Sequence, residues 1–102
     1  MRVVEAIKAK MRAYPVQHTS IEVACIDNGV DPNADYSLDL KRECNLVVID
    51  LLKQLLALSS VSQSDVSLGF DTEMARKRLL SLLIEEGLDT TGYTQSSVIR
   101  VW

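Results

Sequence analysis

The sequence predicts an all-α fold, a compact four-helix bundle whose third helix is long and buried. The stretch from Lys41 to Leu58, KRECNLVVIDLLKQLLAL, carries apolar residues in steps of four and three, the spacing of one helical stripe. That stripe consists of Cys44, Val48, Leu51, Leu55 and Leu58. The apolar surface is widened beyond the ~100° of an ordinary surface helix by Leu46, Val47, Ile49, Leu52 and Leu56. Such a helix must be covered by neighbours, and three further segments have shorter helical patterns.

Length and composition agree with one such domain. The chain has 102 residues, of which 47% are hydrophobic and 25% charged, as is usual for a soluble domain with one core. Asp50 and Lys53 interrupt the longest apolar run, so we expect no membrane span. Charges are spread through the first residues, MRVVEAIKAKMR, which therefore lack the apolar region of a secretory signal. We expect a cytosolic or intracellularly assembled protein.

The charge balance argues against binding to nucleic acid over a broad face. The net charge is −3, whereas such binding requires many cationic contacts to phosphates. Arg76, Lys77 and Arg78 are a local exception. Three consecutive helical residues spread over ~200°, which favours a solvated helix face over a nucleic-acid contact.

The first helix is predicted from Val3 to Arg12. Val3, Ile7 and Met11 keep helical spacing, and Tyr14 closes the same face. Pro15 is expected to stop the helix, because the residue before proline disfavours the helical conformation.

The second helix is predicted to open at Thr19. Thr19-Ser20-Ile21-Glu22 has the pattern of a capping box, and His18, the only histidine, would then be an exposed loop residue. Gly29 suits the left-handed position after the helix. The apolar residues form one stripe and a second edge: Ile21, Ala24 and Cys25, then Val23 and Ile26.

A turn-rich connection, VDPNADYSL, links residues 30–38. Asp31, Asn33 and Asp35 match the first ligand positions of an EF-hand calcium loop. Tyr36 stands where that loop needs glycine, and Arg42 where it needs the bidentate glutamate. The pattern therefore favours turn hydrogen bonds over metal binding.

The long third helix starts near Ser37 or Asp39, either of which could cap it. Asp50 lies between apolar residues, and we expect it to pair with Lys53 along a polar seam. Serines then become frequent after Leu58, which indicates a loop. Residues 62–70 follow as an extended loop or short β segment.

In that segment apolar residues alternate at Val66, Leu68 and Phe70, a period of two that could pair with a partner's sheet edge. The fourth helix is predicted from a cap at Asp71 or Thr72 to about Glu86. Its inner face is Ala75, Leu79, Leu82 and Leu83, with Met74, Leu80 and Ile84 alongside. Gly87 ends it.

Residues 89–102 form an irregular tail after the helical domain of residues 1–88. The tail carries Val98, Ile99, Val101 and Trp102, the last being the only tryptophan. A large apolar ring there either folds back onto the core or waits for a partner. The candidate partner interface therefore comprises Val66, Leu68, Phe70, Val98, Ile99, Val101 and Trp102.

Residues with catalytic potential are few. Cys25 and Cys44 lie in apolar helical segments, which favours buried, reduced thiols over a disulfide or a reactive nucleophile. There is no Gly-rich phosphate loop and no nucleophile elbow. We therefore expect no enzyme activity, no cofactor and no metal.

The order of elements resembles that of head–tail connector proteins, also called head-completion or portal-adaptor proteins, of tailed bacteriophages and prophages. The resemblance covers Val3 to Leu88, through VVEAIKAKM, IEVACIDNGVDPNADY, LVVIDLLKQLLAL and VSLGFDTEMARKRLLSLL. The apolar tail is a departure from the family pattern. The resemblance implies a helical bundle that assembles with itself as a ring between portal and tail-completion proteins, with DNA only passing through.

That resemblance also implies a virion protein that is cytoplasmic in the bacterium before assembly, with no membrane partner and no specific nucleic-acid binding. The sequence leaves one alternative of another class open. A standalone bacterial helical adaptor could bind another protein through a groove beside the long helix.

Overall fold

The computed structural model describes residues 1–61 and 71–90, without the side chains of residues 58–61. The α-helices of this part are α1 (Val3–Lys10), α2 (His18–Asp27), α3 (Lys41–Val61) and α4 (Thr72–Glu85), with a 3-10 turn, η1 (Leu38–Leu40), before α3. The described residues form no strand, and their β-type pairing is an isolated bridge between Arg2 and Asp35. The predicted all-α, four-helix fold is confirmed.

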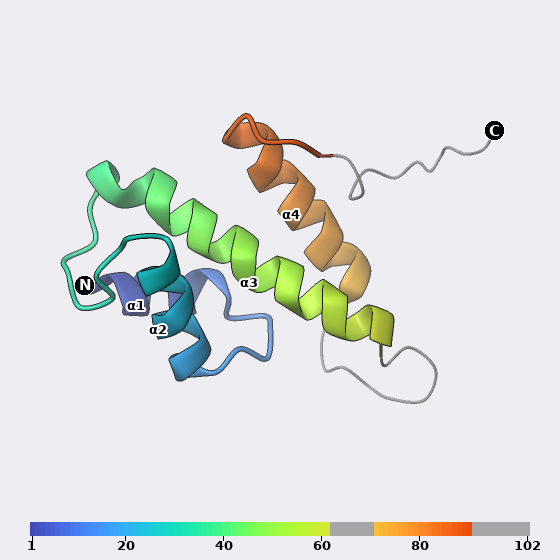
Figure 1. Cartoon of the computed structure of the whole chain (residues 1–102), viewed down its shortest axis with the longest axis horizontal. Helices are drawn as coiled ribbons and strands as arrows, with labels where there is room; N and C mark the ends of the chain where they lie inside the picture. Colours follow the sequence, from blue (N-terminus) through green and yellow to red (C-terminus); the bar gives the residue numbers. More distant parts are fainter. Residues whose placement is uncertain (62–70, 91–102) are drawn as a thin grey trace.

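The long helix α3 runs through the middle of the molecule. Figure 1 shows α1 and α2 on one side of α3 and α4 on the other. Among the described helices, α4 contacts only α3, whereas α1 and α2 contact each other as well as α3. The start of α3 lies beside the end of α4, so these two helices run antiparallel. The helices α2 and α4 therefore lie on opposite sides of α3.

The hydrophobic core is built around α3, as predicted. The buried apolar side chains in the described part of α3 are Cys44, Val47, Val48, Ile49, Leu51, Leu52, Leu55 and Leu56. Leu46 is half-buried, and the side chain of Leu58, the last residue of the predicted stripe, lies outside the described part. The other helices bury the stripes predicted for them: Val3 and Ile7 on α1, Ile21, Ala24 and Cys25 on α2, and Ala75, Leu79, Leu82 and Leu83 on α4. Packing on two sides explains why α3 is apolar around most of its circumference.

The helix α1 ends at Lys10, two residues before the predicted end at Arg12. Met11 is its C-cap residue and is still buried, with its N–H bonded to the Ile7 carbonyl. The Tyr14 N–H then bonds to the Met11 carbonyl, which closes a turn before Pro15. The helix is therefore ended by this turn and not by the proline, whereas Tyr14 packs against the core as predicted.

The predicted start of α2 at Thr19 is wrong. The N-cap residue is Gln17, its side chain makes no capping bond, and His18 is the first helical residue. His18 Nε2 lies 3.3 Å from Glu22 Oε2, one turn along the helix. Glu22 therefore contacts His18 instead of reaching back to cap at Thr19, and His18 is exposed but helical.

The entry into α3 and its exit also differ from the prediction. Ser37 is the N-cap residue of η1 but makes no side-chain capping bond, and Asp39 lies inside η1. At the other end α3 continues to Val61, so the first serines after Leu58 are helical and do not begin the loop. Propensity gives only a weak bias against serine in a helix, and it does not stop a helix that is already packed.

Left-handed glycines end both α2 and α4, as predicted. Gly29 has φ of +73° and Gly87 has φ of +69°. The N–H of the residue after each glycine reaches back to the last turn, Val30 to the Cys25 carbonyl at 2.9 Å and Leu88 to the Leu83 carbonyl at 2.8 Å. This hydrogen bonding is that of the Schellman motif, in which only glycine adopts the required φ without strain.

Asp71 caps α4. Its Oδ1 accepts hydrogen bonds from the N–H groups of Glu73 at 3.0 Å and Met74 at 3.2 Å. These bonds satisfy two backbone donors that have no partner within the helix. Of the two cap residues that the sequence left open, Asp71 and Thr72, the structure selects Asp71.

We expect Asp71→Ala to lower the free energy of unfolding by about 0.5–2 kcal/mol, the usual loss for an N-cap side chain. Urea titration followed by circular dichroism measures this change. Ser37→Ala is the matched control, because Ser37 also holds an N-cap position but makes no capping bond. Equal losses in the two variants would contradict the capping role of Asp71.

Candidate interaction surfaces

The outward face of α2 carries an apolar surface with a hollow beside it. Val23 and Ile26 are 56% and 66% exposed, although both are large apolar residues. They lie opposite the buried stripe of α2, because residues two and five positions after Ile21 point away from it on a helix. A hollow of about 620 Å³ adjoins them. We call its lining the α2 surface: Thr19, Glu22, Val23, Ile26, Asp31, Pro32 and Asn33.

The loop that forms the second wall of this hollow is fixed by backbone hydrogen bonds to α1. The Val4 N–H donates to the Pro32 carbonyl at 2.9 Å, and the Val3 N–H donates to the Ala34 carbonyl at 2.8 Å. These first amides of α1 have no partner within the helix, so the loop satisfies them. The hollow therefore lies between two elements that are held in place.

The polar groups of this loop make turn hydrogen bonds. Asp31 Oδ1 accepts from the Asn33 N–H at 2.9 Å, and Asn33 Oδ1 accepts from Arg2 Nη1 at 3.1 Å. The predicted turn hydrogen bond is confirmed for Asp31, whereas the side chain of Asn33 bonds to that of Arg2. Within residues 1–61 and 71–90, no group of three or more His, Cys, Asp or Glu residues is placed to hold a metal ion.

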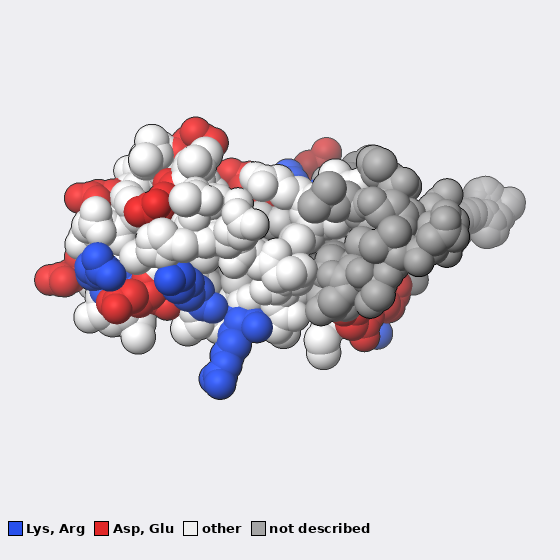
Figure 2. Space-filling view, turned by 90° about the horizontal axis from the view of Figure 1, so that it is seen from below, with Lys and Arg blue, Asp and Glu red and all other residues white. Residues whose placement is uncertain are grey.

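The rim of the α2 surface is acidic. Its lining residues include Glu22 and Asp31 and no lysine or arginine. Arg2 reaches the rim through Asn33, but Arg2 Nε also lies 3.7 Å from Glu5 Oε1, which offsets its charge. The Arg2 backbone N–H donates to the same Glu5 oxygen at 2.8 Å and lowers the pKa of that carboxyl. Figure 2 shows the molecule from the side of α1 and α2, where uncharged side chains cover much of the surface.

A second apolar surface lies on α4. Met74 and Ile84 are 56% and 65% exposed, and Leu80 is half-buried between them along the helix. We call these three residues the α4 surface. They were predicted to lie alongside the inner face of the helix, but α4 has only α3 to cover it among the described helices. The side of α4 turned away from α3 is therefore uncovered in the described part of the chain.

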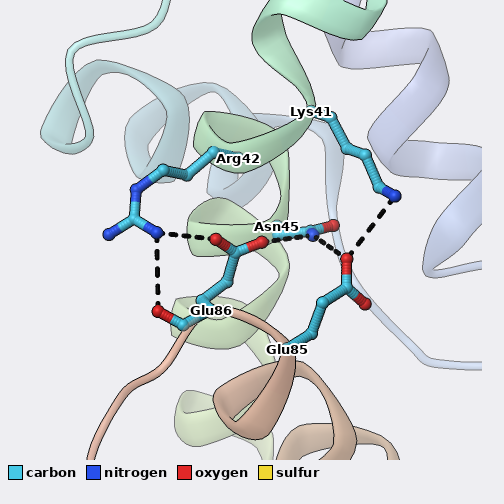
Figure 3. A network of polar contacts seen from close by, with 5 residues as sticks. All are labelled: Lys41, Arg42, Asn45, Glu85 and Glu86. Carbon is cyan, nitrogen blue, oxygen red and sulfur yellow. Dashed lines mark hydrogen bonds and ion pairs between the residues drawn. The ribbon is translucent and has the colours of Figure 1, made fainter.

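A polar network fixes α4 against α3 (Figure 3). Asn45 is 3% exposed, and its Nδ2 donates to Glu86 Oε2 at 2.7 Å and to Glu85 Oε2 at 3.1 Å. Arg42 Nη1 lies 2.7 Å from Glu86 Oε1, and Lys41 Nζ lies 3.6 Å from Glu85 Oε2. Lys41 and Arg42 are more than half exposed, and ion pairs of exposed side chains contribute little to stability. The main contact is therefore the hydrogen bond between Asn45 and Glu86, whose side chain is 10% exposed.

A partly buried hydrogen bond joins the C-terminal end of α2 to α3. Asn28 Nδ2 donates to Asp50 Oδ2 at 2.7 Å and to the Ala24 carbonyl at 2.8 Å. The pairing of Asp50 with Lys53, to which the sequence pointed, stays a prediction. The structure places Asn28 against Asp50. A residue 22 positions away could not be found from helical spacing alone.

The two cysteines are free and buried, as predicted. Burial raises the pKa of the Cys25 thiol to about 11 and also raises that of Cys44. Both groups are therefore protonated at neutral pH, whereas a nucleophilic cysteine needs a lowered pKa. Both belong to the hydrophobic core.

The seven predicted interface residues lie outside the described residues. Val66, Leu68 and Phe70 fall in residues 62–70, and the other four fall in residues 91–102. Their role stays a prediction. In the described part, no helix is long and apolar enough to cross a membrane.

Comparison with protein families gives a match that extends over almost the whole chain. Residues 1–101 match the model of DUF6706, described as a family of unknown function. The chain belongs to this family. The DUF6706 match includes Val98, Ile99 and Val101, so the tail is part of the sequence that the family model describes. No curated protein and no solved structure matches the chain.

Sequence reasoning missed the α2 surface, although a signal was present. The apolar residues of α2 occupy both its inner stripe and the opposite side, with Val23 and Ile26 on the latter. A short helix with two apolar sides needs two partners. In the described structure α1 and α3 cover the inner side, and the outer side is exposed.

Proposed function

We propose that this protein is a non-enzymatic structural subunit of a phage or prophage head–tail connector, which assembles with itself as a ring between portal and tail-completion proteins. The observation that carries the proposal is the presence of two different exposed apolar surfaces, on α2 and α4. They lie on opposite sides of α3 (Figure 1).

This arrangement suits a ring for a geometric reason. In a ring each subunit contacts its neighbours through two different patches, whereas a two-fold dimer uses one patch twice. The α2 surface is a hollow with an acidic rim, and the α4 surface is a convex helix face. Interface centres are depleted in charged residues, and Val23 and Ile26 on α2 fit this pattern. On α4 the exposed Lys77 lies between Met74 and Leu80 on the same face, so its apolar centre is Ile84.

The charge and the order of elements support the same assignment. The described helices have the element order from which the resemblance to the connector family was drawn, including the long apolar third helix. A net charge of −3 limits attraction to phosphate, which suits a channel wall past which DNA moves without specific binding. The protein would reside in the virion, and in the bacterial cytoplasm before assembly.

The test is the assembly of two surface variants, measured alone and mixed. Ile26→Asp places a charge on the α2 surface, and Ile84→Asp places one on the α4 surface. Both positions are more than 60% exposed, so we expect folded proteins. Multi-angle light scattering at high concentration should show rings for the parent chain and monomers for each variant.

The mixture gives the sharper result. One variant keeps an intact α4 surface and the other an intact α2 surface, so the mixture should form heterodimers that cannot grow. Leu38→Asp is the matched control, because Leu38 is 86% exposed and outside both surfaces; it should assemble like the parent. A parent chain that stays monomeric at high concentration, with or without portal protein, would contradict the proposal.

The alternative, a standalone adaptor, has one observation in its favour. A smaller hollow of about 320 Å³ lies beside α3. It is lined by Pro15, Val16, Gln17, Ser20, Leu51, Gln54 and Leu55. A monomer that ignores portal protein but binds an apolar helix at this hollow would favour the adaptor.

A further inference from the structure

We propose that the α2 surface receives the C-terminal tail, residues 91–102, of a neighbouring copy of this chain. This inference rests on the proposed assembly, in which the α2 surface of one copy faces the α4 surface of the next, and it adds the tail that follows α4 to that contact. The receiving site consists of described residues, and the occupant is identified by its sequence chemistry.

The size and character of the hollow limit what can fill it. Its volume of about 620 Å³ lies within the range of ~300–1,000 Å³ that holds a small ligand, so it can receive a few side chains that project from a partner. Val23, Ile26 and Pro32 supply apolar contact area, and Glu22 and Asp31 supply negative charge. The site therefore fits a short apolar segment that carries one positive charge.

Charge selects between the two candidate segments of the sequence. Residues 62–70, SQSDVSLGF, contain one charged residue, Asp65, which the acidic rim would repel. Residues 91–102, TGYTQSSVIRVW, contain Arg100 as their one charged side chain, with Ile99 and Val101 on either side and Trp102 next. Tryptophan and arginine are the residues that most often dominate interface energies. The tail therefore matches both the apolar contacts and the rim.

A neighbouring copy is the proposed occupant because a ring requires contacts between copies. Residues 91–102 span at most ~43 Å when fully extended, so the length of the tail alone does not select the copy. The test must therefore separate contact between copies from contact within one copy.

Disulfide trapping between two singly substituted full-length chains tests the proposal. One chain carries Val23→Cys and the other Val101→Cys, and the two are mixed under mild oxidation. Only contact between copies can give the mixed disulfide dimer, which we expect as the main product on a non-reducing gel. The native Cys25 and Cys44 are buried and should stay reduced.

Two controls make the test specific. Ile84→Cys replaces Val23→Cys in the first, since Ile84 is similarly exposed but lies on α4; we expect at least several-fold less mixed dimer. In the second, Arg100→Glu in the tail chain should lower the yield roughly two- to fivefold, the range for an exposed ion pair, and Glu22→Lys in the receiving chain should restore it.

Three outcomes would overturn the proposal. These are a yield with Ile84→Cys equal to that with Val23→Cys, no mixed dimer at all, and a doubly substituted chain that forms only an internal disulfide. If light scattering still shows rings in any of these cases, the proposed function stands and only the tail assignment fails. If the chain is also monomeric, the proposed function fails with it.

Discussion

Leu51→Ala is expected to lower the free energy of unfolding by about 2–5 kcal/mol, as truncations of buried leucine do. Leu51 lies in the middle of α3 and is 2% exposed. Helices pack on two sides of α3, so the surrounding side chains cannot easily close a cavity there. Urea or guanidinium titration, with the slope of the transition compared between variant and parent, measures the loss.

Leu38→Ala is the matched control for this prediction. It removes the same atoms from a leucine that is 86% exposed, so its effect should stay within about 0.5 kcal/mol. A loss at Leu51 no larger than that at Leu38 would mean that α3 is not the centre of the core.

The burial of α3 could be predicted because apolar spacing reports directly on which residues must leave water. Cys44, Val48, Leu51 and Leu55 recur at helical spacing, and all four are buried. The hydrophobic effect is the largest favourable term in folding, so a pattern that follows it is seldom overridden. The glycine ends of α2 and α4 were predictable for a similar reason, since few residues other than glycine accept φ near +70°.

The start of α2 could not be predicted with the same certainty, because local hydrogen bonds there compete on nearly equal terms. The Thr19–Glu22 pattern is that of a capping box, yet Glu22 contacts His18 and the helix begins one residue earlier. A cap contributes only about 1 kcal/mol, and an i,i+4 pair a few tenths. Differences of this size are decided by the packing of the whole helix.

The outward surfaces escaped prediction for a different reason. Periodicity shows that Val23, Ile26, Met74 and Ile84 are apolar and helical, but it does not show which neighbour covers them. That depends on the arrangement of helices around α3, where α4 has a single described partner. Spacing within one helix holds no information about that arrangement.

The polar network between α3 and α4 was also missed, although the charged residues at both helix ends are unfavourable for the helix dipole. Glu85 and Glu86 stand at the end of α4, and Lys41 and Arg42 at the start of α3, each opposite in sign to what the helix dipole favours. When two helices run antiparallel, the start of one lies beside the end of the other. The acidic residues of one end and the basic residues of the other then attract each other, which offsets their unfavourable interaction with the dipoles. Basic residues at the start of one helix and acidic residues at the end of the next therefore predict that the two helices form an antiparallel pair.

Asn45→Asp tests this network and is expected to cost roughly 3–5 kcal/mol at neutral pH, the scale of an uncompensated buried charge. The substitution keeps the shape of the side chain but replaces the Nδ2 donor with an acceptor. That atom lies 2.7 Å from Glu86 Oε2 and 3.1 Å from Glu85 Oε2, so three carboxylates would meet at a site that is 3% exposed. Chemical denaturation across a range of pH measures the cost.

The pH dependence separates this charge effect from a simple packing defect. Burial and the neighbouring carboxylates raise the pKa of the introduced carboxyl above its usual value of about 3.9. The cost is therefore complete above that raised pKa and shrinks as pH falls towards ~4, because the protonated group can again donate to Glu86. Asn33→Asp is the matched control: Asn33 is exposed and its Oδ1 already accepts from Arg2, so the change should stay within about 0.5 kcal/mol. A cost at position 45 that is as small, or that does not vary with pH, would mean that the network does not hold α4 to α3.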